Sequence, residues 1–96
     1  MYIMVVNHDV EEYERWKTGF DQFPPSRGGA RFFHVNRNID DPNNITVICG
    51  WDTVDAAVAF RDDPELSDAM ASAGVIGQPR FEISEEVASS SSDPAP

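Results

Sequence analysis

Two segments near the middle of the chain most constrain its fold. Residues 30–39 and 45–51 are rich in β-branched and aromatic residues, and only the five residues Asp40–Asn44 separate them. Asp, Asn and Pro make up this separating segment, and these residues favour turns. Two strand-forming runs joined by so short a loop predict a β-hairpin, with adjacent and antiparallel strands. Every other element of the chain has to be placed around this hairpin.

A strand and a helix are expected before the hairpin. Residues 2–7 form a short run rich in Ile and Val, long enough for one strand. A helix is expected to start at Asp9, with Asp9 as its N-cap and Glu12 completing a capping box. Pro24 and Pro25 end this helix because they lack backbone donors. Its apolar stripe, at spacings of three and four, is Val10, Tyr13, Trp16, Phe20 and Phe23.

Two short helices and a last strand are expected after the hairpin. Asp52 or Thr53 can cap the first of these helices, and its expected inward face is Val54, Ala57, Val58 and Phe60. Asp63 can cap the second, with Pro64 in its first turn and Gly74 as its stop. The segment GVIGQP, residues 74–79, is predicted to be a loop. Residues 79–87 contain the last strand, with Phe81 and Ile83 on one side.

The resulting order, β-α-β-β-α-(α)-β, is the split βαβ pattern of an α+β, ferredoxin-like fold. It gives a four-stranded antiparallel sheet with the helices on one face. The other face carries apolar and aromatic residues, so we expect a second copy to cover it and form a dimeric α+β barrel. The 96 residues suffice for one domain, assigned to residues 1–87. The Ser/Pro-rich tail, residues 88–96, is predicted to be disordered.

Charge and cysteine content narrow the possible partners. Seven basic and 17 acidic residues give a formal net charge of −10, which disfavours binding to nucleic acids and anionic membrane surfaces. No apolar run approaches the roughly 20 residues that a membrane-spanning helix needs. The N-terminal residues lack a basic leader, and the single cysteine, Cys49, cannot form an intrachain disulfide. These features predict a cytoplasmic protein.

Four sequence segments, in this order, resemble a known group of proteins. They are H-x-V-x-x-Y-x-x-W-K at residues 8–17, RNIDDPNN at 37–44 followed by a strand ending in GWD, FRDDPEL at 60–66 and AGVIG-x-P at 73–79. The chain resembles dimeric α+β-barrel proteins of the antibiotic biosynthesis monooxygenase-like superfamily, particularly small bacterial proteins often labelled cyclase. The resemblance covers nearly all of residues 1–87.

That resemblance implies several alternative activities. The superfamily includes cofactor-free monooxygenases, polyketide cyclases, haem-degrading enzymes, lactone isomerases and proteins with no known activity. The resemblance therefore favours a cofactor-independent enzyme that acts on a small hydrophobic or aromatic, polyketide-like molecule. A non-catalytic dimeric module that binds a small ligand or a partner is the alternative. Haem ligation by His8 or His34 is a third possibility that rests only on the resemblance.

The strand over residues 30–39 carries the first candidate catalytic group. Alternation places Phe32, His34 and Asn36 on one face of this strand, opposite the face expected to join the core. On this basis they would line the barrel cavity. His34 can transfer a proton near neutral pH, and Asn36 can donate a hydrogen bond to a developing enolate. The alternative is a polar pair that only forms hydrogen bonds across a dimer interface.

Other residues were assigned by the same reasoning. His8 lies at the end of the first strand and is the third candidate catalytic residue. Trp16 and Trp51, with Phe32, are candidates for stacking on a planar substrate, although Trp16 also fits a plain core role. Arg31 and Arg37 could hold an anionic group or pair with carboxylates, and Cys49 fits an inert core thiol. No motif with metal-ligand spacing is present, so no metal site is predicted.

Overall fold

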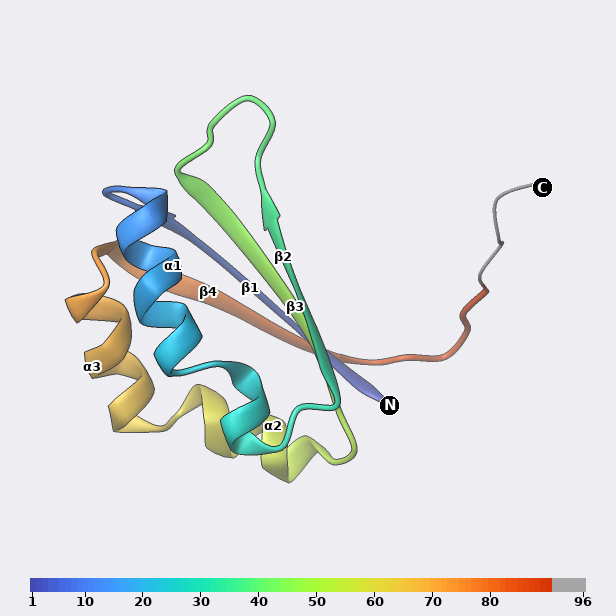
Figure 1. Cartoon of the computed structure of the whole chain (residues 1–96). Helices are drawn as coiled ribbons and strands as arrows, with labels where there is room; N and C mark the ends of the chain where they lie inside the picture. The colour runs from blue at the N-terminus through green and yellow to red at the C-terminus, as the bar shows by residue number, and fades with distance from the viewer. Residues whose placement is uncertain (91–96) are drawn as a thin grey trace.

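The computed structural model describes residues 1–90, which form one antiparallel sheet with helices packed on one of its faces (Figure 1). The four strands are β1 (Tyr2–Val10), β2 (Phe32–Arg37), β3 (Asn44–Trp51) and β4 (Val75–Glu85). Their order in the sheet is β2-β3-β1-β4. The helices are α1 (Tyr13–Gln22), the 3-10 helix η1 (Pro25–Gly28), α2 (Val54–Arg61) and α3 (Pro64–Ser72). This arrangement confirms the predicted α+β, ferredoxin-like fold.

The core lies between the central strands and the helices. Alternate residues of β1 and β3 point toward the helices and are buried: Met4, Val6, His8 and Val10 from β1, and Ile45, Val47, Cys49 and Trp51 from β3. Trp16 of α1, Phe60 of α2 and Leu66 of α3 close this core from the helix side. Among the described residues, His8 is the one buried polar residue.

The prediction for the start of α1 was wrong. Asp9 lies in β1, paired with Asn44 of β3 and Ile76 of β4, and its carboxylate accepts a hydrogen bond from the Asn44 side chain at 2.9 Å. The helix begins only at Tyr13, and Glu12, its N-cap, makes no side-chain capping bond. Strand pairing on both sides outweighs a local cap, whose contribution is about 1 kcal/mol.

Two other predicted details were wrong. Residues 75–79 are not a loop, because β4 begins at Val75, and a shift in register opposite Asn7 and Asp9 accommodates the glycine-containing start of this strand. Val54 does not face inward, since it is 42% exposed.

The capping predictions for α2 and α3 are confirmed: Thr53 accepts from the Ala56 amide and Asp63 accepts from the Glu65 amide. Residues 88–90 have no regular secondary structure, and the remainder of the predicted tail lies outside the described residues.

No element in the described part of the chain covers the second face of the sheet (Figure 1). Ile3, Val5 and Ile48 are half-buried there, and Phe32 is exposed beside them. At the other end of this face the Asn7 amide donates to Asn44 Oδ1 at 3.1 Å and to Thr46 Oγ1 at 2.9 Å. The open face therefore has an apolar half and a polar half. Among the described residues, no helix has the length and apolar character needed to cross a membrane.

Helices α1 and α3 approach most closely at two small residues. A Cβ added to Gly19 would lie 2.8 Å from the Cβ of Ala73, closer than side-chain carbons pack. The absence of a side chain at Gly19 therefore sets the separation of these two helices.

This contact predicts a sign change in a double-mutant cycle. Gly19→Ala improves helix propensity by about 1 kcal/mol, but overpacking typically costs 1–3 kcal/mol, so we expect a net loss of up to about 2 kcal/mol. In an Ala73→Gly background the clash is gone, and Gly19→Ala should be neutral or stabilising. Urea unfolding of the four proteins measures the coupling. Identical effects of Gly19→Ala in both backgrounds would contradict it.

Candidate functional site

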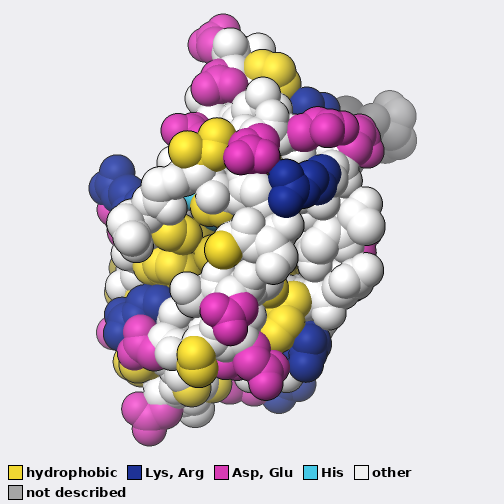
Figure 2. Space-filling model, turned by 90° about the vertical axis from the view of Figure 1, so that its left-hand side faces the viewer, with side chains coloured by type: hydrophobic (Ala, Val, Ile, Leu, Met, Phe, Trp, Pro, Cys, Tyr) yellow, Lys and Arg dark blue, Asp and Glu magenta, His cyan; other side chains and the backbone are white. Residues whose placement is uncertain are grey.

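A cavity lies inside the single copy, between the sheet and the helices. The volume open to the centre of a water molecule is about 40 Å³. This is room for about three water molecules. Figure 2 looks onto the side of the molecule that carries α1 and α3 and shows apolar side chains, with a histidine just visible among them, in a hollow of the surface. The lining residues are Val6, His8, Trp16, Gly19, Phe20, Phe23, Pro25, Val47, Phe60, Leu66, Ala69, Met70 and Ala73.

His8 is the polar group of this cavity. Its side chain points to the helix side of β1 and is only 4% exposed. Its Nδ1 atom is buried and has no hydrogen-bond partner among the described residues. A buried polar atom without a partner costs about 1–3 kcal/mol, so its presence calls for an explanation. A water molecule or a ligand in the cavity would supply the missing partner.

Burial keeps the His8 imidazole neutral. Removal from water lowers the pKa of His8 below its usual value of 6.5, and this effect exceeds the opposing effects of its own backbone and of the Asp9 carboxylate. At neutral pH the ring is therefore uncharged. One ring nitrogen then carries a hydrogen and the other a lone pair, so His8 can donate one hydrogen bond and accept one.

Aromatic rings form the wall next to His8. The Trp16 ring lies edge-on to the imidazole with the centroids 5.5 Å apart, and Phe20 packs on Trp16 at 5.0 Å. The surroundings of His8 are thus flat and apolar, which suits an aromatic or apolar ligand.

The structure brings only two of the predicted site residues together. His8 and Trp16 line the cavity, whereas Trp51 is fully buried outside it and packs on Phe60 with the ring centroids 5.2 Å apart. The Trp51 indole N–H donates to the sulfur of Cys49 at 3.3 Å, so its polar atom is already used. Burial raises the pKa of the Cys49 thiol, which fits the inert role predicted for it.

Phe32, His34 and Asn36 lie on the opposite side of the sheet. They pair with Gly50, Ile48 and Thr46 of β3, so their side chains share the open face, as alternation predicted. Phe32 covers Gly50, and His34 is exposed with its ring 5.4 Å from the Phe32 ring. A ligand that contacts His8 therefore cannot contact His34 of the same copy, because the sheet separates them.

Neither predicted arginine reaches the cavity. Arg31 pairs with Asp52 through contacts of 2.6 Å and 2.7 Å, and this pairing lowers the pKa of the Asp52 carboxyl. Arg37 lies over the Tyr13 ring at 4.0 Å and donates to the Pro42 carbonyl. In the described part of the chain, no group of three or more His, Cys, Asp or Glu residues is placed to hold a metal ion.

Sequence reasoning missed the residues that create the cavity. Phe20 and Phe23 were expected only on the apolar stripe of the first helix, and Gly19 was not singled out. The available signal was a glycine in the middle of an amphipathic helix, which often has a packing or functional reason. Here Gly19, Ala69 and Ala73 line the same cavity from two helices.

Comparison with solved structures identifies the class of fold. A protein from Bordetella bronchiseptica, provisionally named an antibiotic biosynthesis monooxygenase, matches with a TM-score of 0.71 at 20% identity, over 91% of this chain and 97% of that one. A protein from Deinococcus radiodurans with the same provisional name matches with a TM-score of 0.71 at 13% identity, over 95% and 97% of the two chains. SnoaB, a cofactor-independent oxygenase from Streptomyces nogalater, matches with a TM-score of 0.70 at 14% identity, over 92% and 94%.

These matches show that the chain has the fold of the antibiotic biosynthesis monooxygenase-like proteins, as its sequence motifs had indicated. No protein-family model and no curated protein matches the sequence. The identities lie below 25%, so the likeness establishes the fold and leaves the activity to be argued from the site.

The neutral, buried state of His8 predicts a specific pH dependence of stability. In the unfolded chain this group takes up a proton near pH 6.5, whereas the folded protein resists protonation. As the pH falls below about 6.5, the wild type should lose stability relative to His8→Phe, by at most about 1.4 kcal/mol per pH unit. At pH 7, His8→Phe should be at least as stable as the wild type, because it removes an unsatisfied buried group.

Thermal melts of both proteins from pH 7.5 to about 5 check this. Self-repulsion among the acidic residues is common to both variants and cancels in the difference. Asp52 loses its ion pair with Arg31 when its carboxyl takes up a proton. The pKa of this carboxyl is lowered below 3.8, so the loss falls outside this pH range. Parallel curves for the two proteins would contradict the prediction.

Proposed function

We propose that the chain is a cofactor-independent enzyme that acts on a small hydrophobic or aromatic, polyketide-like molecule in the cavity between the sheet and the helices. The observation that carries the proposal is His8, whose buried Nδ1 has no partner among the described residues and lies in an otherwise apolar cavity. Similarity in fold to SnoaB, a cofactor-independent oxygenase, supports this kind of chemistry. The sequence indicated His34, in the barrel cavity, as the first candidate for proton transfer. The proton acceptor proposed here is His8, on the helix side of the sheet.

In the monooxygenase form of this reaction, the neutral His8 removes a proton from an acidic carbon of the substrate, such as the methylene of an anthrone. The resulting carbanion reacts with molecular oxygen to form a carbon–oxygen bond and a peroxide anion, which takes the proton back from His8. Loss of water from the hydroperoxide then leaves a ketone. One oxygen atom ends in the product and the other in water, so no external reductant is needed.

The same proton transfer would drive a cyclisation. With a poly-β-ketone as substrate, the enolate formed by His8 attacks another carbonyl of the same molecule and closes a ring. Either substrate needs more room than the cavity offers, so binding requires a lining side chain to move. Met70 is suited to this because it is half-buried, unbranched and has three rotatable side-chain bonds.

A non-catalytic role is the second candidate. Among the described lining residues, His8 is the one ionisable group, and no cationic group lies beside it to stabilise an enolate. A cavity of this composition can also hold an apolar ligand without transforming it. The protein would then store or sense a small molecule.

We further propose that two copies pair through the open face of the sheet. Its apolar half, formed by Ile3, Val5, Ile48 and Phe32, is the part that a partner would cover. His34 and Asn36 would then lie between the two sheets, either as a second proton-transfer site or as polar contacts between subunits. We place the protein in the cytoplasm, a proposal supported by a single, buried cysteine.

Turnover by His8 and His34 variants tests the enzymatic proposal. Oxygen uptake with an anthrone as probe should fall by roughly 10²–10⁴-fold in His8→Phe, because the variant has no proton acceptor. His34→Ala tests the second predicted position. Loss of turnover in His34→Ala with His8→Phe unaffected would move the proton transfer to the space between the sheets. Ligand binding without turnover in the wild type, by thermal shift, would favour the binding module.

The subunit contact predicts a selective effect of charge on the open face. Ile48→Glu should convert a dimer into a folded monomer, because it places a charge at the centre of the covered apolar area. Ile39→Glu is the matched control, since Ile39 is 97% exposed at the tip of the β2–β3 hairpin. Light scattering coupled to size exclusion gives the masses. A monomeric wild type, or dimers in both variants, would overturn the proposal.

A further inference from the structure

We infer that the ligand of the cavity carries a carboxylate and that Arg27 binds it in a groove outside the cavity. The inference rests on the proposed function, in that it assumes that the cavity binds a small molecule. It adds the chemical class of that molecule and a residue that determines specificity.

The groove runs along the outside of the contact between α1 and α3. It shares Gly19, Phe23, Ala69 and Ala73 with the inner cavity, so the same four residues separate the two spaces. Its volume, measured in the same way, is about 330 Å³, compared with about 40 Å³ inside. Three of the four separating residues are Gly or Ala. Because Gly19 and Ala73 are in contact, a ligand that spans both spaces has to pass beside Phe23 and Ala69.

The small inner volume means that only one end of a ligand can reach His8. The rest of an aromatic molecule has to extend beyond the cavity, and the groove is the larger space on the other side of the shared residues. A ligand of this kind therefore meets two environments. The inner one is apolar with His8, and the outer one is partly polar and includes Gln22, Arg15 and Arg27.

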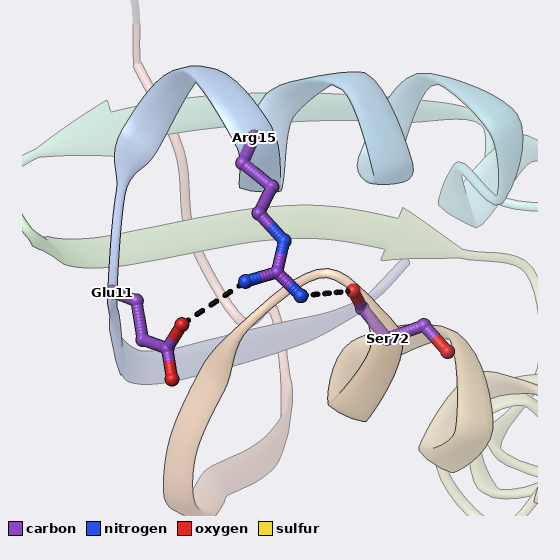
Figure 3. A network of polar contacts seen from close by, with 3 residues as sticks. All are labelled: Glu11, Arg15 and Ser72. Carbon is purple, nitrogen blue, oxygen red and sulfur yellow. Dashed lines mark hydrogen bonds and ion pairs between the residues drawn. The ribbon is translucent and has the colours of Figure 1, made fainter.

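The charged residues that line the groove differ in sign from most of those in the chain. The protein has seven basic and 17 acidic residues, yet both charged residues that line the groove are arginines. Arg15 is already committed. As Figure 3 shows, it donates to Glu11 at 3.0 Å and to the Ser72 carbonyl at 2.9 Å, which ties α1 to the C-terminal end of α3.

Arg27 is the cation that remains available. Its nearest carboxylate among the described residues, Glu65, lies 3.9 Å away, beyond hydrogen-bond distance. The Arg27 side chain also donates one long hydrogen bond, of 3.4 Å, to the Gln22 carbonyl. The guanidinium lies 4.3 Å from the centre of the Phe23 ring, a residue that lines both the cavity and the groove. A positive charge with free N–H groups is thus held against the shared wall and can bind a carboxylate at two points.

A pair of ligands that differ only in charge tests this inference. 2-Naphthoate and 2-naphthamide have the same ring system, and their dissociation constants can be measured by calorimetry. The wild type should bind the carboxylate about fivefold more tightly, the size expected for a half-exposed ion pair. Arg27→Gln should bring this ratio to about one and leave the affinity for the amide unchanged.

Arg61→Gln is the matched control. It removes the same charge from an exposed arginine that pairs with Asp62 and lines neither the cavity nor the groove, so the ratio should stay at the wild-type value. A ratio that Arg27→Gln leaves unchanged, or that Arg61→Gln lowers equally, overturns the inference while the amide's binding still supports the cavity. If neither compound binds, cavity binding itself fails, and the inference fails with it.

Discussion

The pairing of β1 with strands on both sides is the constraint on which the rest of the structure depends. As a central strand, β1 has its register fixed by β3 on one edge and by β4 on the other. Because side chains alternate, this register sends Met4, Val6 and His8 to the helix side together. A slip of one residue would exchange His8 for Asn7 and expose the core. The position of the candidate proton acceptor is therefore tied to the pairing that forms the fold.

The same pairing explains why a costly residue can persist in the core. A strand held along both edges tolerates one inward polar side chain, because the surrounding apolar residues stabilise its position. Among the described residues, Nδ1 of His8 has no hydrogen-bond partner, and burial disfavours the charged form of the ring. An apolar residue at this position would stabilise the protein more. Conflicts of this kind between local chemistry and burial are expected at functional sites, where stability is given up for activity.

Much of the fold was predictable because its signals are local. The hairpin follows from a turn-rich segment between two strand-forming runs, and the caps at Thr53 and Asp63 follow from side chains next to the backbone that they bind. The placement of His34 on the same face of β2 as Phe32 and Asn36 followed from simple alternation. The helix start at Asp9 was not predictable in this way. The capping signal there was local, but the competing strand partners, Asn44 and Ile76, are far away in the sequence.

The location of the cavity was unpredictable for a related reason. Its existence depends on how far the helices stand from the sheet and from each other, which is set by a long-range contact between Gly19 and Ala73. Sequence patterns show which residues face inward but not whether the space between them is filled. By contrast, His34 and Asn36 could be placed on the open face from the sequence, because alternation along the strand alone decides which face they occupy.

The two faces of the sheet therefore carry separable properties. The His8 cavity is built from β1, β3 and the helices of one copy, so the residues that line it are present without a second subunit. The open face offers apolar area and exposed polar groups. Pairing of two copies would act on the cavity only through the shared strands, whose register the hydrogen-bonded ladders already fix. It follows that dimerisation can add stability or a second site between the sheets, while the chemistry assigned to His8 belongs to each subunit separately.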